Sequence, residues 1–246
     1  MRLAVLADIH GNLDALNAVL DDLALQSPDL TVNLGDSLSG PLWPGQVADT
    51  LIGLNWPTVR GNHDRWLVER PEPLGPWEAD TLPHLKTAHL SWLSAQPASR
   101  RIEDVFLCHA TPGDDTTYWL HHVRPDGVFA PSPLSRVAEL AGQTEAGLLL
   151  CGHTHLAGAV RLPDGRLVVN PGSVGCPGYE DDHPVHHRAE AGTPHACYAI
   201  LDRRKDGWSV AFRRVQYDPT RASALAASRD RPDWASVLAT GWLPAG

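Results

Sequence analysis

Short apolar runs and longer periodic segments alternate along the first part of the chain. Residues 3–7 are uniformly apolar, which is typical of a strand covered on both faces. Residues 13–25 place apolar side chains three and four apart, the spacing of an amphipathic helix, and Asn12 is a plausible N-cap for it. The next expected elements are a strand near 30–34, a helix near 45–53 and a third strand leading into 58–64. This alternation predicts the opening of an α/β layered fold.

The pattern changes in the second half of the chain. Residues 65–100 look helical and are rich in Trp and Pro. Asp164 and Gly165 predict a hairpin turn between two strands, so this half looks more antiparallel than the first. Irregular stretches cover 111–132 and 176–195. Strands are expected at 105–108, 147–151, 157–162, 167–169, 196–201 and 208–215.

The chain shows no internal repeat and no linker composition. Its tail, 218–246, is Ala-rich and is expected to be helical. We therefore expect a single domain over 1–246, with a core of about 1–217 and a helical C-terminal tail.

Composition excludes several classes of partner. The net charge of -9 argues against sequence-independent binding to nucleic acid or to an anionic membrane, while bound cations could still hold a small anionic substrate. The four cysteines form no C-x-x-C pair, which favours buried, reduced thiols over disulfides or ligands. The N-terminus runs straight into a strand, and no apolar stretch is long enough to span a membrane. A cytoplasmic location is expected.

Five short motifs each place a metal-binding side chain directly after an expected strand, where open α/β sheets hold their ligand sites. Side chains alternate in an extended segment, so the two donors of D-x-H should point the same way, as should the two of H-x-H. This nitrogen and oxygen set suits Mn, Fe, Zn, Ni or Co better than Ca. The donors are Asp8, His10, Asp36, Asn62, His109, His153 and His155.

Seven donors are too many for one ion, but two ions that share a carboxylate would use them all. Two neighbouring cations lower the pKa of a shared water and hold the phosphoryl oxygens for in-line attack by hydroxide. Each motif alone has a plainer explanation as a turn, a helix cap or a core histidine. The five in this order favour a two-metal site.

With these motifs, the chain resembles the calcineurin-like metallophosphoesterases, and more narrowly their small bacterial phosphodiesterase or phosphatase members. Residues 170–175 (NPGSVG) and the following strand at 198–202 are similar to the closing signature of that subgroup. The resemblance spans about 1–217. It implies a four-layer αββα sandwich with two mixed β-sheets.

The resemblance also implies a role for each motif residue. His63 matches the acid that protonates the leaving group, and Asp64 matches the carboxylate that orients it. The bridging hydroxide would attack phosphorus, and Mn²⁺ is the expected metal, with Fe, Zn, Ni, Co or Mg as alternatives. The first ion would take Asp8, His10, Asp36 and His155, and the second Asp36, Asn62, His109 and His153.

Substrate contacts are less defined by the pattern. Asn12 could touch substrate or only cap a helix, and Arg60 could touch substrate or only form an ion pair. Tyr118 and Trp119 lie shortly after His109 and could stack on a base or pack the loop onto the domain. The chain lacks the Arg of the protein phosphatase pattern G-D-x-x-D-R-G, which argues against a phosphoprotein substrate. The histidines of 176–195 could extend the site, but we favour a solvent-exposed position.

Two hypotheses follow. The first is a phosphodiesterase or phosphatase that acts on a small phosphorylated substrate of nucleotide type. The alternative is a non-catalytic scaffold that keeps the fold and binds partners, but such scaffolds lose ligands or the acid histidine, and here all are present. A nuclease would need a basic groove, which the acidic balance disfavours.

Overall fold

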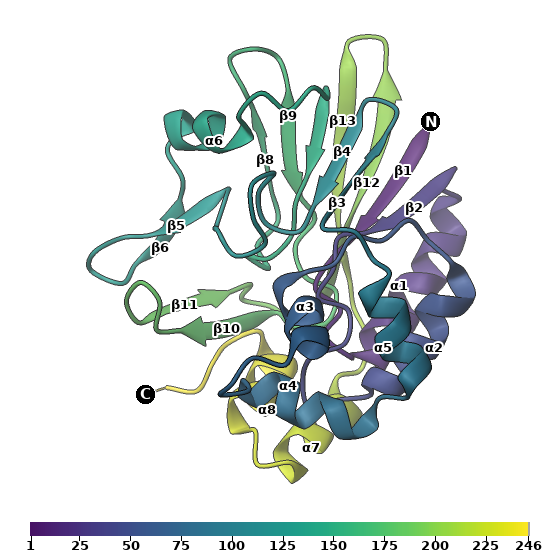
Figure 1. Ribbon diagram of the computed structural model, residues 1–246, viewed down its shortest axis with the longest axis vertical. Coiled ribbons are helices and arrows are strands. Elements are labelled where there is room, and N and C mark those ends of the chain that lie inside the picture. The colour runs from purple at the N-terminus through teal and green to yellow at the C-terminus, as the bar shows by residue number, and fades with distance from the viewer. Residues whose placement is uncertain (246) are drawn as a thin grey trace.

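The computed structural model describes residues 1–245 and contains two mixed sheets (Figure 1). In the first sheet β1 runs parallel to β2, whereas β12 and β13 are antiparallel to it. In the second sheet β4, β7 and β9 are parallel, and antiparallel strands close both edges. The first sheet has the order β13 (Gly207–Val215), β12 (Ala196–Arg204), β1 (Arg2–Leu6), β2 (Leu30–Asn33). The second has the order β3 (Ser99–Ile102), β4 (Val105–Cys108), β7 (Leu148–Leu150), β9 (Leu167–Asn170), β8 (Gly158–Arg161).

Alternating side chains of the strands separate the molecule into layers. In β1, Leu3 and Val5 face the second sheet and join its buried leucines and valines, while Ala4 and Leu6 face the opposite way. That outer face is covered by α1 (Leu13–Gln26), α2 (Pro44–Leu54) and α5 (Thr87–Ser94). The outer face of the second sheet packs on α6 (Leu134–Ala141) through Val137. These layers confirm the αββα sandwich.

The third expected strand is almost absent. Thr58 forms one parallel bridge with Asn33, and two backbone hydrogen bonds hold it there. The chain then turns into α3 (Asn62–Glu69), so no room remains for a strand. The region that follows is helical as expected, with α4 (Pro76–Thr81) and a short 3-10 turn at Leu82–His84.

The two stretches expected to be irregular each contain a hairpin. One is β5 (His121–Val123) with β6 (Phe129–Pro131), and the other is β10 (Gly178–Asp181) with β11 (His187–Glu190). Neither has an alternating apolar pattern, which is why the sequence did not indicate them. Tertiary packing beside the site stabilises them instead, as the stacking of Phe129 on His187 shows.

The tail forms α7 (Thr220–Ser228) and α8 (Pro232–Thr240), as expected. Trp234 and Leu238 pack with Leu42 and Cys176, so the tail covers the lower part of the sandwich in Figure 1. All four cysteines are free and buried, which confirms the reduced-thiol interpretation. Within residues 1–245, every helix is too short or too polar to cross a membrane.

We expect Asp22→Asn to weaken the contact between α1 and the first sheet. The Arg213 guanidinium holds the pKa of Asp22 below its usual value, and donates from Nη2 at 2.7 Å. Because the folded pKa is depressed, this contribution is complete above the unfolded pKa of about 3.9 and is lost as the pH falls through the folded value. The free energy of unfolding should drop by about 1 kcal/mol at neutral pH and by less in acid, measured by urea denaturation. Asp21→Asn, an exposed neighbour, should change nothing; equal losses at both pH values would contradict the role of the pair.

Candidate metal centre

The seven expected donors lie together where the parallel strands of both sheets end. Asp8 and His10 follow β1, Asp36 follows β2, and His109 follows β4. His153 and His155 follow β7, and Asn62 is the first residue of α3. Within each sheet these strands run in the same direction, so their carboxyl ends meet at one edge.

The donors form two groups of three that could each hold a metal ion. One contains Asp8, His10 and His155, and the other contains Asp36, His109 and His153. Both carboxylates reach from their own group toward the other. Asp36 Oδ2 is 3.1 Å from His109 Nε2 and 4.0 Å from His10 Nε2. Asp8 Oδ1 is 3.5 Å from His155 Nε2 and 4.0 Å from His109 Nε2, so the two groups are neighbours.

All four imidazoles are oriented by backbone carbonyls. Carbonyl oxygen can only accept, so the ring nitrogen that meets it carries a proton, and the other ring nitrogen faces the site, where it can bind a metal once the imidazole is neutral. His10 Nε2 and His155 Nε2, both of this second kind, lie only 3.2 Å apart. The anchoring pairs are His10 Nδ1 with Ser39 O (2.9 Å), His109 Nδ1 with Leu34 O (2.8 Å), His153 Nε2 with Thr116 O (2.9 Å) and His155 Nδ1 with Cys176 O (2.7 Å).

The carboxamide of Asn62 faces the second group. One of its terminal atoms lies 3.2 Å from Asp36 Oδ2, 3.0 Å from His109 Nε2, 3.2 Å from His153 Nδ1 and 3.3 Å from the Asp115 carbonyl oxygen, where its NH2 group can donate. With a cation among these atoms, the carboxamide oxygen would turn to the ion as a further donor. The donor set fits a divalent transition metal at this position.

The charges of the site also favour a cation. Burial raises the pKa of Asp8 to about 8 and lowers those of His10 and His153 to about 3 and about 4. Burial alone would lower the pKa of His109, but Asp36 outweighs it and raises the value to about 10. A proton on His109 thus takes the place of positive charge between buried carboxylates, and metal binding would displace it.

Five of the seven donors have a left-handed backbone conformation. Asp8, His10 and Asp36 have φ of 55°, 48° and 51°, and His153 and His155 have 69° and 59°. Such conformations are unfavourable for non-glycine residues and concentrate at functional sites. They also correct the extended-chain interpretation: the loops are not extended, and the two histidines of H-x-H enter different groups.

Glycines allow the Asp36 loop and the start of α3 to approach each other. A Cβ at position 61 would overlap Asp36 Oδ1 and lie 2.7 Å from the Asp36 backbone nitrogen. Gly35, with φ of 98°, lies against Gly61 from the other side. Gly35, directly before Asp36, and Gly61, directly before Asn62, therefore fix the position of the Asp36 carboxylate.

We expect Gly61→Ala to displace Asp36. A shift on the order of 1 Å should lower turnover about 100-fold, with weaker binding of both metals. Gly53→Ala is the matched control, because a Cβ there meets nothing within 4 Å and α2 should gain about 0.5–1 kcal/mol. Metal titration and initial rates test the pair, and normal turnover by Gly61→Ala would show that the close approach is unimportant.

His63 lies beside the donors, but its orienting carboxylate differs from the expected one. Its Nδ1 is 2.5 Å from Glu78 Oε1, and Trp77 stacks on the ring at a centroid distance of 4.9 Å. Asp64 instead accepts the backbone N–H groups of Asp36, Ser37 and Gly61 at 2.8–3.1 Å. The expected orienting role of Asp64 is therefore wrong, because its oxygens already hold the Asp36 loop. No local signal in the sequence pointed to Glu78.

Of the four residues considered as substrate contacts, only one lines the cavity beside the donors. Asn12 is fully buried, accepts from Ala15 N and donates to Gly175 O, so it is a helix cap. Trp119 is also buried, packs beside α6 and donates to Val137 O, because the loop turns it into the core. Of the two roles left open for each residue, the structure therefore supports the helix cap for Asn12 and the packing role for Trp119. Tyr118 does line the cavity, whereas Arg60 does not.

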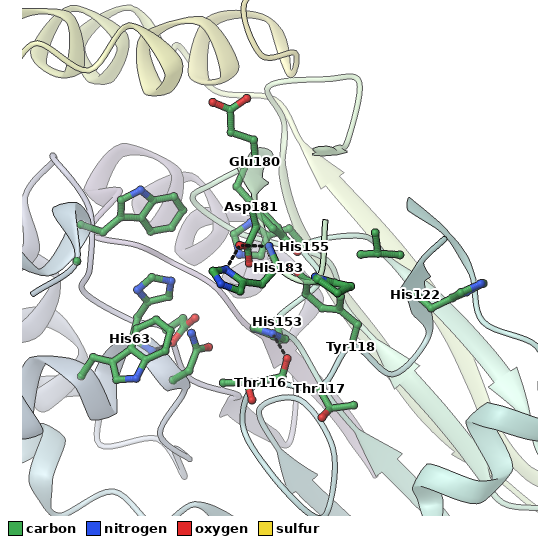
Figure 2. A pocket seen from close by; sticks show the side chains of 18 of the residues that line it. His63, Thr116, Thr117, Tyr118, His122, His153, His155, Glu180, Asp181 and His183 are labelled. Atoms are coloured by element: carbon green, nitrogen blue, oxygen red, sulfur yellow. Dashed lines mark hydrogen bonds and ion pairs between the residues drawn. The ribbon is translucent and has the colours of Figure 1, made fainter. Parts of the chain in front are cut away.

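A cavity of about 960 Å³ opens from the donors. In Figure 2, His63 lies on one side, Tyr118 and His122 lie on the other, and His153 and His155 lie between them. His183 of the β10–β11 hairpin also lines it, although its side chain is 94% exposed, so the His-rich segment lies partly at the site and partly in solvent. Aromatic walls come from Trp66, Trp77, Tyr118 and Tyr179.

Comparison with known proteins gives one family match and three similar proteins. The sequence model of the calcineurin-like phosphoesterase superfamily domain matches residues 1–203. An uncharacterized protein of Methanocaldococcus jannaschii is 26% identical over an alignment of 257 positions, gaps included, that covers 94% of each chain. A metallophosphoesterase structure from Sphaerobacter thermophilus is 25% identical with a TM-score of 0.74, covering 98% of this chain and 99% of that one. A hypothetical protein from Pyrococcus horikoshii, 20% identical, shares the fold with a TM-score of 0.75 over 99% of both chains.

Proposed function

The chain belongs to the calcineurin-like phosphoesterase superfamily, and we propose that it hydrolyses a phosphate ester or anhydride with two divalent cations. The convergence of the donors carries this proposal. Four imidazoles, each anchored to a backbone carbonyl through one ring nitrogen, present the other ring nitrogen to a buried space that they share with two carboxylates and one carboxamide. A non-catalytic scaffold has no need of this arrangement.

The donors divide between the two ions in a simple way. The first ion would be held by Asp8, His10 and His155, and the second by Asn62, His109 and His153, with Asp36 shared. Bound divalent cations supply Lewis acidity toward water and the phosphoryl oxygens. We propose Mn²⁺ as the first metal to test. The mixed nitrogen and oxygen donor set would also accept Fe, Zn, Ni, Co or Mg.

His63 is proposed to protonate the leaving group. Burial alone would lower its pKa, but the charges of Asp36 and Glu78 outweigh burial and raise it. The oxygen of a water molecule forms a bond to phosphorus and the water gives up one proton to solvent. The bond from phosphorus to the leaving oxygen breaks, its electron pair stays on that oxygen, and the oxygen takes a proton from His63, which regains one from solvent. The products are an alcohol, or a second phosphate, and a phosphate.

The cavity supports a substrate larger than inorganic phosphate. Its volume is typical of sites for drug-sized molecules, and the rings of Trp66, Trp77 and Tyr118 offer flat apolar walls. We propose a substrate of nucleotide type, with Tyr118 as a stacking surface. The net charge of -9 still argues against long nucleic acids.

The direct test measures metal content and hydrolysis together. Purified protein, stripped with a chelator and reloaded with Mn²⁺, is assayed against para-nitrophenyl phosphate, bis-para-nitrophenyl phosphate and a panel of nucleotides. Two ions per chain with metal-dependent release of phosphate or alcohol are expected. Metal-loaded protein that turns over none of these substrates would support the scaffold instead.

A further inference from the structure

The carboxylate of Glu78 is buried in a helix that carries none of the metal-binding motifs. Its side chain is 2% exposed, and its Oε1 is 2.5 Å from Nδ1 of His63. In residues 1–245, His63 is the only side chain that pairs with it. A buried carboxylate is costly unless it is paired, so the fold must stabilise this contact specifically.

Aromatic rings fix the plane of the His63 imidazole. Trp77 stacks on it with an interplanar angle of 15°, and Trp66 meets it edge-on at 4.9 Å. Trp77 in turn packs against Trp234 of α8 at a centroid distance of 4.8 Å. Trp234 belongs to the C-terminal tail, which lies outside the matched residues 1–203. The tail therefore supports Trp77 of α4, the ring that stacks on His63.

We propose that Glu78, on α4, is the residue that positions His63 as the leaving-group acid. This inference rests on the proposed function. Nδ1–H donated to Glu78 leaves Nε2 as the nitrogen that can meet a substrate, and the stack on Trp77 prevents rotation out of the cavity. Asp64 cannot take this role, since three backbone N–H groups already occupy its oxygens.

A positioning role makes a distinct kinetic prediction. An acid matters most when the leaving oxygen is strongly basic and little when it leaves readily as an anion. Loss of Glu78 should thus slow phenyl esters far more than para-nitrophenyl esters. A purely structural defect, or a loss of metal, would slow both alike.

The test compares wild type, Glu78→Gln and Glu78→Asp on phenyl and para-nitrophenyl esters, as phosphate monoesters and as diesters of thymidylate. Glu78→Gln has nearly the same volume, and we expect about a 100-fold loss of kcat with phenyl esters, less than about 3-fold with para-nitrophenyl esters, and full metal content. Glu78→Asp should lie between. Glu69→Gln, an exposed Glu on α3, is the matched control and should match wild type.

A double-mutant cycle completes the test. In a His63→Ala background, Glu78→Gln should cost nothing further, because the group that it positions is gone. Equal losses for both leaving groups, or an undiminished effect without His63, would overturn the positioning role. Absence of metal-dependent turnover by the wild type would instead overturn the proposed function, before any variant is compared.

Discussion

Replacing Asp36 with Asn should weaken the binding of both metals together and lower turnover by about 1,000-fold. Its carboxylate lies near donors of both groups, 3.1 Å from His109 Nε2 and 4.0 Å from His10 Nε2, and we propose that it is shared by the two ions. Removing one negative charge from a site that is almost completely buried takes several kcal/mol of stabilisation from both cations and from the transition state. Calorimetric titration with Mn²⁺, together with kcat, measures both effects.

The control for this variant is Asp164→Asn, an exposed Asp at the β8–β9 turn that pairs only with Arg166 among the described residues. It should bind metal and turn over as the wild type does. If Asp36→Asn left one site with its original affinity, the shared position of Asp36 would be disproved. The variant's melting temperature shows whether the fold survives.

The second large effect is expected for His63→Ala. We expect kcat to fall by about 100- to 1,000-fold with a phenyl ester while both metals stay bound, because the change removes a proton donor and no ligand. The donors that form the two metal groups do not include His63, whose Nδ1 is engaged by Glu78. Metal content is measured by elemental analysis alongside steady-state kinetics.

His183→Ala is the control for that change. His183 lines the same cavity from the β10–β11 hairpin but is largely exposed, so its loss should alter kcat by less than about 3-fold. A His63→Ala protein with empty metal sites would show that His63 supports metal binding, and its role as an acid would be withdrawn.

The corrections within the site share a physical origin. A substrate contact was one of two roles considered for Asn12 and Trp119, because both are close in sequence to metal donors, yet the fold turns both side chains inward. Asn12 satisfies the first turn of α1, and Trp119 fills space beside α6. Proximity along the chain does not fix side-chain direction where a loop leaves a strand, because one or two backbone dihedrals decide it.

The sequence alone indicated an α/β layered fold and the seven donors, and the family resemblance implied the four-layer sandwich. Strands such as β1 and β7 are short apolar runs and α1 has helical periodicity, and these are local properties that do not depend on distant contacts. The metal site could be predicted from its motifs because each donor follows an expected strand and because the ends of parallel strands gather at one edge of a sheet.

Only the tertiary structure decided which groups meet. Glu78 reaches His63 because α4 packs between α3 and the C-terminal tail, and this packing brings together residues far apart in the sequence. The left-handed conformations of Asp8, His10 and Asp36 likewise persist only because the surrounding fold offsets their local cost. Local patterns specify which elements form and which chemistry they carry, whereas the partners of each charged side chain depend on the free energy of the whole packed molecule.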